Sequence, residues 1–454
     1  MKTIVKEKKF SMDMCNGPIL KKMLLFGLPL MISNLLQLLF NAADIIVVGR
    51  FAGVSSLAAV GATSSLVSLI VNLFTGISVG VNILVSNYHG SKRMQDLTAV
   101  IHTGMAFALV GGVIFSVAGI ISAPYLLKLM QTPEEVIDLA TVYIRAYFGG
   151  LSAIAVYNFG AAILRAVGDT KRPFLFLTFA GTVNVILNLF FVILLKWGVL
   201  GVGLATTISQ ILSALLVMRC LMKEKTEIRV CLKNIRMQKA ALKKILQIGL
   251  PAGFQGILFS ISNVLIQSYI NLFGETVVAG NSAGVNIEGF VYVTVNTFYY
   301  VTISFVSQNY GAKKYQRIGR IVNVALLCVL FFGIIFGGLS VLCGENLLSF
   351  YTNDFQVIQS GMLRIKMVCG FLVFCGFMDV MNATLRGLGY AVLPTVFTLV
   401  GIGLRMLYII VMFQIEQFRM VETIYVSFAT TWLLTAIGLA FAYRAKKRLL
   451  LKGI

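Results

Sequence analysis

The chain has 454 residues, of which 58% are hydrophobic and 12% are charged, and its formal net charge at pH 7 is +21. Soluble domains carry about a quarter of their residues as Asp, Glu, Lys and Arg, so this composition excludes an ordinary soluble fold. The high apolar content also excludes a disordered chain. Apolar stretches here are about 20 residues long, the length of a helix that crosses a bilayer. The sequence therefore predicts an all-α polytopic membrane protein.

We expect twelve transmembrane helices along the chain. Their approximate ranges are 20–41, 56–86, 97–121, 136–158, 174–195, 199–221, 245–270, 278–307, 321–342, 357–382, 391–413 and 423–443. A membrane β-barrel would instead show alternating segments of about 10 residues. The first 18 residues are basic and polar and lack an apolar core, so we expect no cleavable signal peptide.

Basic residues gather in alternate loops. The loop after the sixth stretch is the richest, with Lys223, Lys225, Arg229, Lys233, Arg236 and Lys239. The intervening loops are acidic or nearly neutral, as at Glu134, Glu135 and Asp138. The positive-inside rule therefore predicts a multi-pass cell-membrane protein with both termini in the cytoplasm. Topology accounts for the positive charge, and no nucleic-acid-binding motif is present, so we expect no nucleic-acid partner.

The chain is duplicated, with a period of about 221 residues. Four elements recur: Gly27-Leu28-Pro29 as Gly249-Leu250-Pro251, Val85-Ser86 as Val306-Ser307, Leu164-Arg165 as Leu385-Arg386, and Pro173 as Pro394. Each half has an even number of stretches, so the halves share one orientation, as in transporters built from parallel repeats. We predict an N-terminal six-helix bundle (1–222), a basic cytoplasmic linker (223–241) and a C-terminal six-helix bundle (242–454).

Pro29 and Pro251 occupy the same place in the first stretch of each half. A proline inside a helix removes one hydrogen bond and kinks it. Two interpretations stay open: a static packing kink, or a bend that changes with the ligand state.

Three acids lie within predicted spans: Asp44, Glu288 and Asp379. A carboxylate at mid-bilayer costs about 2.5–3.5 kcal/mol on insertion scales, so such acids face a cavity or pair with a base. One interpretation makes them proton carriers. The alternative is a buried acid paired with one of the basic residues within spans, which are Arg145, Arg364, Lys366 and Arg405.

Asn184 and Asn188 are four residues apart and share a helix face, and Thr206 and Thr207 follow in the next stretch. With Asp44 they supply hard oxygen atoms, which suit a small cation such as Na⁺ as well as a proton. Amide and hydroxyl side chains also join helices in membranes, so ordinary helix packing stays an alternative.

Together these features resemble the multidrug and toxic compound extrusion (MATE) family. The resemblance rests on the two six-helix halves, on Gly27-Leu28-Pro29, on the segment from Asp44 to Val48-Gly49-Arg50, and on the element at Leu164 and Leu385. It implies a V-shaped cavity between the halves and export of mostly cationic, amphipathic compounds in exchange for H⁺ or Na⁺.

Individual residues match the family pattern. Asp44 matches the acid of its first helix, Pro29 the kink there, and Asp379 the acid of its tenth helix. Asn184, Asn188 and Thr206 match the polar cluster around the first acid. Some members have Asp where this chain has Asn188. Others have a Glu in the seventh helix. Here Glu288, one helix later, is the candidate substitute for that Glu. These departures leave the coupling ion open.

We hypothesise alternating access, with cation coupling at Asp44, Asn184, Asn188, Thr206, Asp379 and Glu288. The residues expected to line the substrate cavity are Gln37, Asn41, Tyr292, Met378 and Met381, with Phe298 and Tyr299 beside them. For any one apolar member, packing or lipid contact is the alternative. We expect small organic cations and the lipid bilayer as partners, and one chain as the functional unit.

Other functions stay open or are excluded. A lipid-linked sugar flippase of the same architecture would use Arg145, Arg364, Lys366 and Arg405 to bind pyrophosphate, and a specialised metabolite exporter is a further alternative. The chain has no metal-ligand spacing, G-x-S-x-G or P-loop, so we expect neither an enzyme nor a cofactor.

Overall fold

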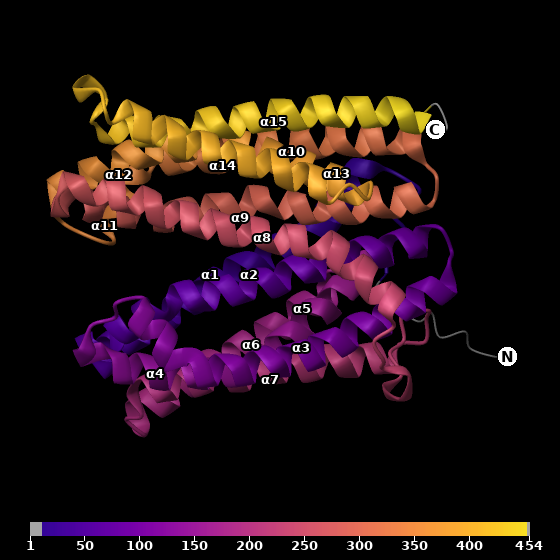
Figure 1. Cartoon of the computed structure of the whole chain (residues 1–454), viewed down its shortest axis with the longest axis horizontal. Helices are drawn as coiled ribbons and strands as arrows, with labels where there is room; N and C mark the ends of the chain where they lie inside the picture. Colours follow the sequence, from indigo (N-terminus) through magenta and orange to yellow (C-terminus); the bar gives the residue numbers. More distant parts are fainter. Residues whose placement is uncertain (1–10, 452–454) are drawn as a thin grey trace. The chain divides into compact units, whose positions relative to one another are not determined.

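The computed structural model describes residues 11–451, and all regular structure in that range is helical (Figure 1). The first half contains α1 (Ile19–Val47), α2 (Val54–Gly90), α3 (Met94–Leu129), α4 (Glu134–Gly149), α5 (Leu151–Ala166), α6 (Lys171–Leu189) and α7 (Gly198–Lys223). The second half contains α8 (Lys239–Ile270), α9 (Glu275–Gly311), α10 (Tyr315–Leu342), α11 (Gly344–Ser349), α12 (Phe355–Val368), α13 (Leu372–Gly387), α14 (Val392–Met412) and α15 (Val421–Leu451).

The predicted twelve spans are confirmed. Within residues 11–451, eleven helical segments are long and apolar enough to cross a membrane, and α4 with α5 makes the twelfth if the bent pair is one span. That pair is bent by 43° where Gly149 and Gly150 meet. At the corresponding place in the second half, the short 3-10 helix Cys369–Phe371 separates α12 from α13. Paired glycines are a common cause of such breaks.

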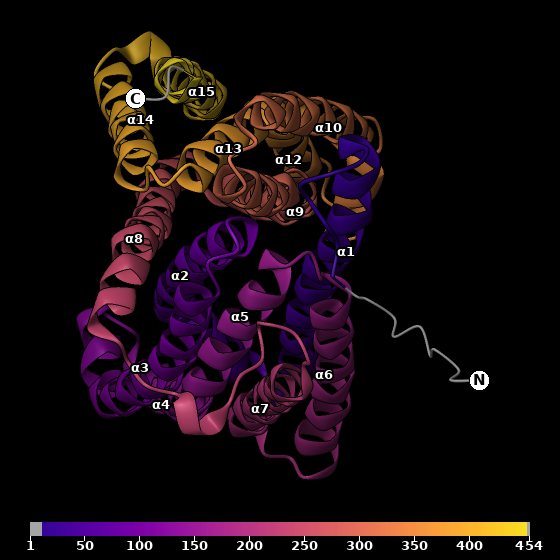
Figure 2. The same ribbon diagram turned by 90° about the vertical axis from the view of Figure 1, so that its right-hand side faces the viewer.

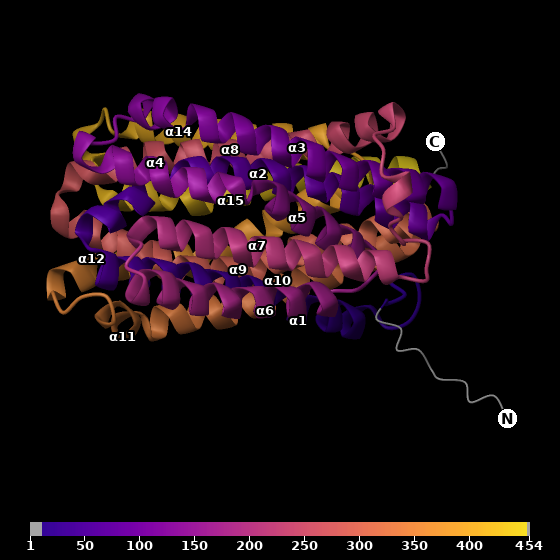
Figure 3. The same ribbon diagram turned by 90° about the horizontal axis from the view of Figure 1, so that it is seen from below.

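Residues cluster into two compact units. Unit 1 comprises 1–64, 81–245 and 311–313, and unit 2 comprises 65–80, 246–310 and 314–454. In unit 1, α5 packs against α3 and α7, and α6 packs against α1 and α7 (Figure 2). In unit 2, α13 packs against α10 and α15, and α14 packs against α15. The short α11 lies at the end of unit 2 that is opposite the last turn of α15 (Figures 1 and 3).

The middle of α2 belongs to unit 2 because it packs directly on α8. A Cβ atom on Gly76 would lie 2.2 Å from the backbone nitrogen of Gly253, and one on Gly249 would lie 2.6 Å from the Cα of Ile77. Only glycine permits this approach of two helix backbones. The unit boundaries follow this packing, and the predicted division at 1–222 and 242–454 stays a prediction.

The recurring Leu-Arg element forms the same helix end in both halves. α5 is followed by Gly168 with φ +90°, and α13 is followed by Gly389 with φ +91°. Asp169 N–H donates to the Leu164 carbonyl and Tyr390 N–H to the Leu385 carbonyl, both at 3.0 Å. This is a Schellman-type helix end, which needs a left-handed residue that glycine adopts without strain. The repeat thus conserves a helix-ending device.

The linker between α7 and α8 packs onto unit 1. The backbone N–H of Cys231 donates to Nε2 of His102 at 3.1 Å, and that of Gln238 donates to Oγ1 of Thr103 at 3.2 Å. Ile228 and Val230 of the linker itself are buried. Pro29 and Pro251 lie inside continuous helices, α1 and α8, and a bend that changes with ligand state stays a prediction.

Candidate functional site

Asp44 lies in the last turn of α1 in unit 1, with oxygen and amide groups of α6 and α7 around it. Nδ2 of Asn188 donates a hydrogen bond to its carboxylate, and the Thr206 hydroxyl also hydrogen-bonds it. Asn188 Nδ2 lies 3.4 Å from Asn184 Oδ1, and Asn184 Nδ2 lies 3.4 Å from Thr206 Oγ1. The structure thus brings all four residues together, because three sequence-distant helices meet here.

The donor set around Asp44 fits a small cation. Among residues 11–451, no basic side chain forms an ion pair with this carboxylate. Asn188 is 1% exposed, and its Oδ1 has no hydrogen-bond partner. An unsatisfied buried acceptor beside an unpaired carboxylate is costly unless a proton or cation joins them. Carboxylate, amide and hydroxyl oxygens are the ligands that hard cations prefer.

Two tyrosines of α4 complete the surroundings of Asp44, and the sequence reasoning missed them. Tyr143 and Tyr147 both interact electrostatically with Asp44, and their ring centroids lie 6.3 Å apart. Their spacing of four residues places them on one helix face. The spacing of Tyr143 and Tyr147, just before the Gly149-Gly150 break, was the sequence signal that could have identified them.

Asp379 lies on α13 in unit 2 and has a different environment. It is 7% exposed, and its Oδ2 accepts a hydrogen bond of 2.8 Å from Nδ2 of Asn296 on α9. The same amide nitrogen lies 3.0 Å from the hydroxyl of Tyr292. Asn296 was not predicted as a site residue, although it lies four residues after Tyr292. The two acids Asp44 and Asp379 therefore belong to separate polar clusters in separate units.

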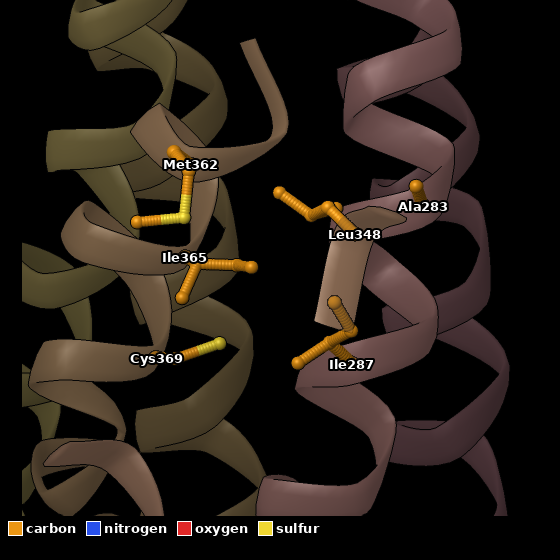
Figure 4. Close-up of a cluster of buried hydrophobic side chains, with 6 residues drawn as sticks. All are labelled: Ala283, Ile287, Leu348, Met362, Ile365 and Cys369. Carbon is orange, nitrogen blue, oxygen red and sulfur yellow. The ribbon is translucent and has the colours of Figure 1, made fainter. Parts of the chain in front are cut away.

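Glu288 does not join either cluster. Its Oε2 accepts hydrogen bonds from Nε and Nη2 of Arg364 at 3.0 and 2.6 Å, and Arg364 also donates to Asn281 at 2.7 Å. The neighbouring side chains Ile287 and Ile365 belong to a buried apolar cluster of α9, α11, α12 and the 3-10 helix Cys369–Phe371; its members are Ala283, Ile287, Leu348, Met362, Ile365 and Cys369 (Figure 4). The geometry favours the alternative given above for Glu288, a buried acid paired with a base.

The residues predicted to line a substrate cavity differ in exposure. Met378 and Met381 are buried within unit 2, which favours packing for both. Gln37 and Asn41 are exposed on α1, and Tyr292 is 38% exposed.

The four basic residues that could bind pyrophosphate have separate environments. Arg145 belongs to unit 1 and donates to a backbone carbonyl, whereas Arg364 binds Glu288. Lys366 is exposed, and Arg405 is buried beneath the Phe428 ring, 4.4 Å from its centroid.

The MatE family model matches residues 29–190 and 251–411, one match in each half. The chain belongs to this family. The resemblance to the MATE family stated from the sequence is thus confirmed, and the duplicated match agrees with the internal repeat. Membership and the twelve candidate spans together make the chain a multi-pass membrane protein.

Curated MATE relatives are named for drug resistance. The chain is 28% identical to the "Probable multidrug resistance protein YoeA" of Bacillus subtilis over 390 residues, covering 84% of each chain. It is 21% identical over 392 residues to the "Multidrug export protein MepA" of Staphylococcus aureus, covering 83% of this chain and 84% of that one.

Solved structures share the MATE fold. A MOP superfamily transporter from Pyrococcus furiosus, described as having a binding pocket of reverse polarity, has a TM-score of 0.90 at 22% identity. That match covers 96% of this chain and 98% of the other. An outward-facing multidrug resistance MATE family transporter has a TM-score of 0.89 at 22% identity, covering 97% and 98%. At these identities the likeness concerns the fold.

Proposed function

We propose that this protein is a secondary active exporter that moves amphipathic, mostly cationic organic compounds out of the cell in antiport with H⁺ or Na⁺. The observation that carries the proposal is the Asp44 cluster. It is a carboxylate in a membrane-spanning helix with amide and hydroxyl partners, no basic partner among residues 11–451, and an unsatisfied oxygen on Asn188. The names of the curated relatives support a drug-like substrate.

Alternating access explains how such a site couples two ligands. With the carboxylates ionised, the protein favours uptake of an organic cation from the cytoplasm or the inner leaflet. A proton or Na⁺ that enters from outside neutralises Asp44 or Asp379 and favours release of the drug outward. Each ligand shifts the equilibrium only through its different affinities for the two states.

The driving force depends on the number of ions exchanged. One elementary charge that moves inward down about 150 mV releases roughly 3.4 kcal/mol, but export of a monovalent cation consumes the same amount. A one-for-one exchange is therefore driven by the concentration gradient of the coupling ion, and a second inward ion adds roughly 3.4 kcal/mol, worth a gradient of about 300-fold. Both termini face the cytoplasm in this scheme, because the basic loops mark that side.

Reconstitution of the purified chain in liposomes tests the proposal. The assay follows a fluorescent organic cation under an imposed H⁺ gradient and, separately, under an imposed Na⁺ gradient. Uphill movement with one ion supports antiport and identifies the coupling ion. If folded protein gives no uphill movement under either gradient, the proposal is wrong, and rescue of a flippase-depleted strain then tests the lipid-flippase alternative.

A further inference from the structure

Arg386 is a buried cation in the last turn of α13, and it is 2% exposed. Its guanidinium donates to three neutral side chains on three other helices of unit 2. They are the hydroxyl of Tyr299 on α9, Oε1 of Gln255 on α8 at 2.6 Å, and Oγ1 of Thr395 on α14 at 3.1 Å. Its Nε has no hydrogen-bond partner.

This arginine is less well compensated than the other buried arginines of unit 2, since its cation–π contact is a longer one, with the Tyr299 ring at 5.9 Å from the centroid. Arg364 forms an ion pair with Glu288, and Arg405 lies beneath the rings of Phe428 and Trp432, at 4.4 and 5.6 Å from their centroids. Among residues 11–451, no acid forms an ion pair with Arg386. A guanidinium does not lose its proton in a protein, so a full positive charge is fixed here.

The charge lies beside the polar groups that surround Asp379. Arg386 follows Asp379 by seven residues, two helical turns or about 10.5 Å along α13, and the two interact electrostatically. On α9, Tyr292 and Asn296 contact one another and Asn296 binds Asp379, while Tyr299, one turn further on, binds Arg386. A line of polar groups therefore runs from Asp379 toward the α13–α14 turn and ends at Arg386.

The α13–α14 turn lies on the cytoplasmic side in the topology of the proposed antiporter, so this inference rests on that function. We propose that Arg386 is the inner electrostatic barrier of unit 2, which stops a proton or Na⁺ at Asp379 from passing to the cytoplasm unless substrate is exchanged. A fixed positive charge repels both ions strongly where burial keeps bulk water away, as at the 2% exposed Arg386. The hydrogen bond from Arg386 also occupies the Tyr299 oxygen, so this phenol is a poor acceptor for an incoming proton.

The test measures ion leak without substrate. Full-length protein is reconstituted in liposomes that contain a pH-sensitive dye, a membrane potential is imposed, and no organic cation is added. Arg386→Gln is expected to raise the H⁺ influx at least about tenfold over the native chain, and Arg386→Lys is expected to stay near the native rate, because it keeps the charge. The same comparison with ²²Na⁺ covers Na⁺ coupling. If Arg386→Gln fails to fold, Arg386→Met is used in its place, with the same expected increase in H⁺ influx.

Two further variants separate a barrier from general loosening of unit 2. Arg405→Gln removes a buried arginine that does not belong to the line of polar groups between Asp379 and Arg386. This variant is expected to keep the native rate of H⁺ influx. Asp379→Asn combined with Arg386→Gln is expected to suppress the leak, because the ion no longer has its binding group.

The inference is wrong if folded Arg386→Gln is as tight as the native chain, if Arg405→Gln leaks equally, or if the double variant still leaks. The leak is recorded without any organic cation, so failure of the antiport proposal shows separately, as absent uphill transport by the native chain.

Discussion

The first half gathers Asn184 and Asn188 around the carboxylate of Asp44. The second half has Arg405, Ile409 and Ile266 at the repeat-related positions. The correspondence follows the flanking matches: Pro29 and Pro251 are 222 residues apart, and Pro173 and Pro394 are 221 apart. Ile266 is 3% exposed and Ile409 1%, so apolar packing replaces the acid and one of the amides.

The two places also share a threonine motif. Asn184 lies 3.4 Å from Thr206 in Ala205-Thr206-Thr207, and Arg405 donates to Thr431 in Ala429-Thr430-Thr431 at 3.0 Å. In the second half the Arg405 guanidinium, held by Thr431, therefore takes the repeat-related place of Asn184, whose amide in the first half belongs to the Asp44 cluster. The acid of the second half lies on another helix, since the repeat partner of Asp379 is Asn158. Duplication preserved the helices, but the charges diverged.

The largest expected effect comes from removing the acid of the first half. Asp44→Asn should abolish uphill export, so that the accumulation ratio of the organic cation falls to about 1. The reason is that position 44 then has no carboxylate to bind the coupling ion in one state and release it in the other. Liposome uptake under the coupling gradient measures this. Asp96→Asn, which changes an acid in the exposed pair with Arg93, is the matched control. Intact uphill export in both Asp44→Asn and Asp379→Asn contradicts the mechanism.

Breaking the ion pair of the second half should reduce the free energy of unfolding strongly. Glu288→Gln leaves Arg364 as an uncompensated buried cation, which costs about 3–5 kcal/mol. Thermal unfolding in detergent, read together with transport at a permissive temperature, checks this. Glu345→Gln on the exposed face of α11 should change stability by no more than about 0.5 kcal/mol. A stable Glu288→Gln that has lost coupling would instead assign Glu288 to ion transport.

A smaller effect is expected at the amide beside Asp44. Asn188→Leu removes the donor to the carboxylate and the unsatisfied oxygen, at a cost of about 1–3 kcal/mol to the ion-bound site. The half-saturating concentration of the coupling ion should then rise roughly tenfold. Asn158→Ala on α5, whose amide donates to the Ile154 carbonyl of its own helix, is the control. Unchanged ion affinity in Asn188→Leu would remove this residue from the site.

The smallest effect is expected at Arg405. Arg405→Met keeps the length of the side chain and removes a buried charge that has no ion-pair partner among residues 11–451, so stability should change by no more than about 1 kcal/mol. Transport should stay near the native rate, because the proposed mechanism gives this place no coupling ion to bind. Loss of coupled export in a folded Arg405→Met would break the comparison between the halves.

The sequence predicted the helices and the repeat well, because apolar length and loop charge act locally. It also predicted the Asp44 cluster, since Asn184 and Asn188 share a helix face whatever that helix packs against. It failed to separate Glu288 from Asp379, because their surroundings depend on which helix supplies a base. Arg364 is 76 residues after Glu288, and only tertiary packing brings the two together. Asn296, Tyr143 and Tyr147 were missed for the same reason.

The glycine contact between α2 and α8 has a consequence for anyone who recombines proteins of this family. An exchange of half-chains at the linker looks simple from the repeat, yet residues 65–80 of the first half pack into unit 2. A foreign second half with any larger residue in place of Gly249 would place its Cβ 2.6 Å from the Cα of Ile77 on α2. Chimaeras should therefore carry the middle of α2 together with its partner α8, so the inheritable module is a packing unit rather than a continuous half of the gene.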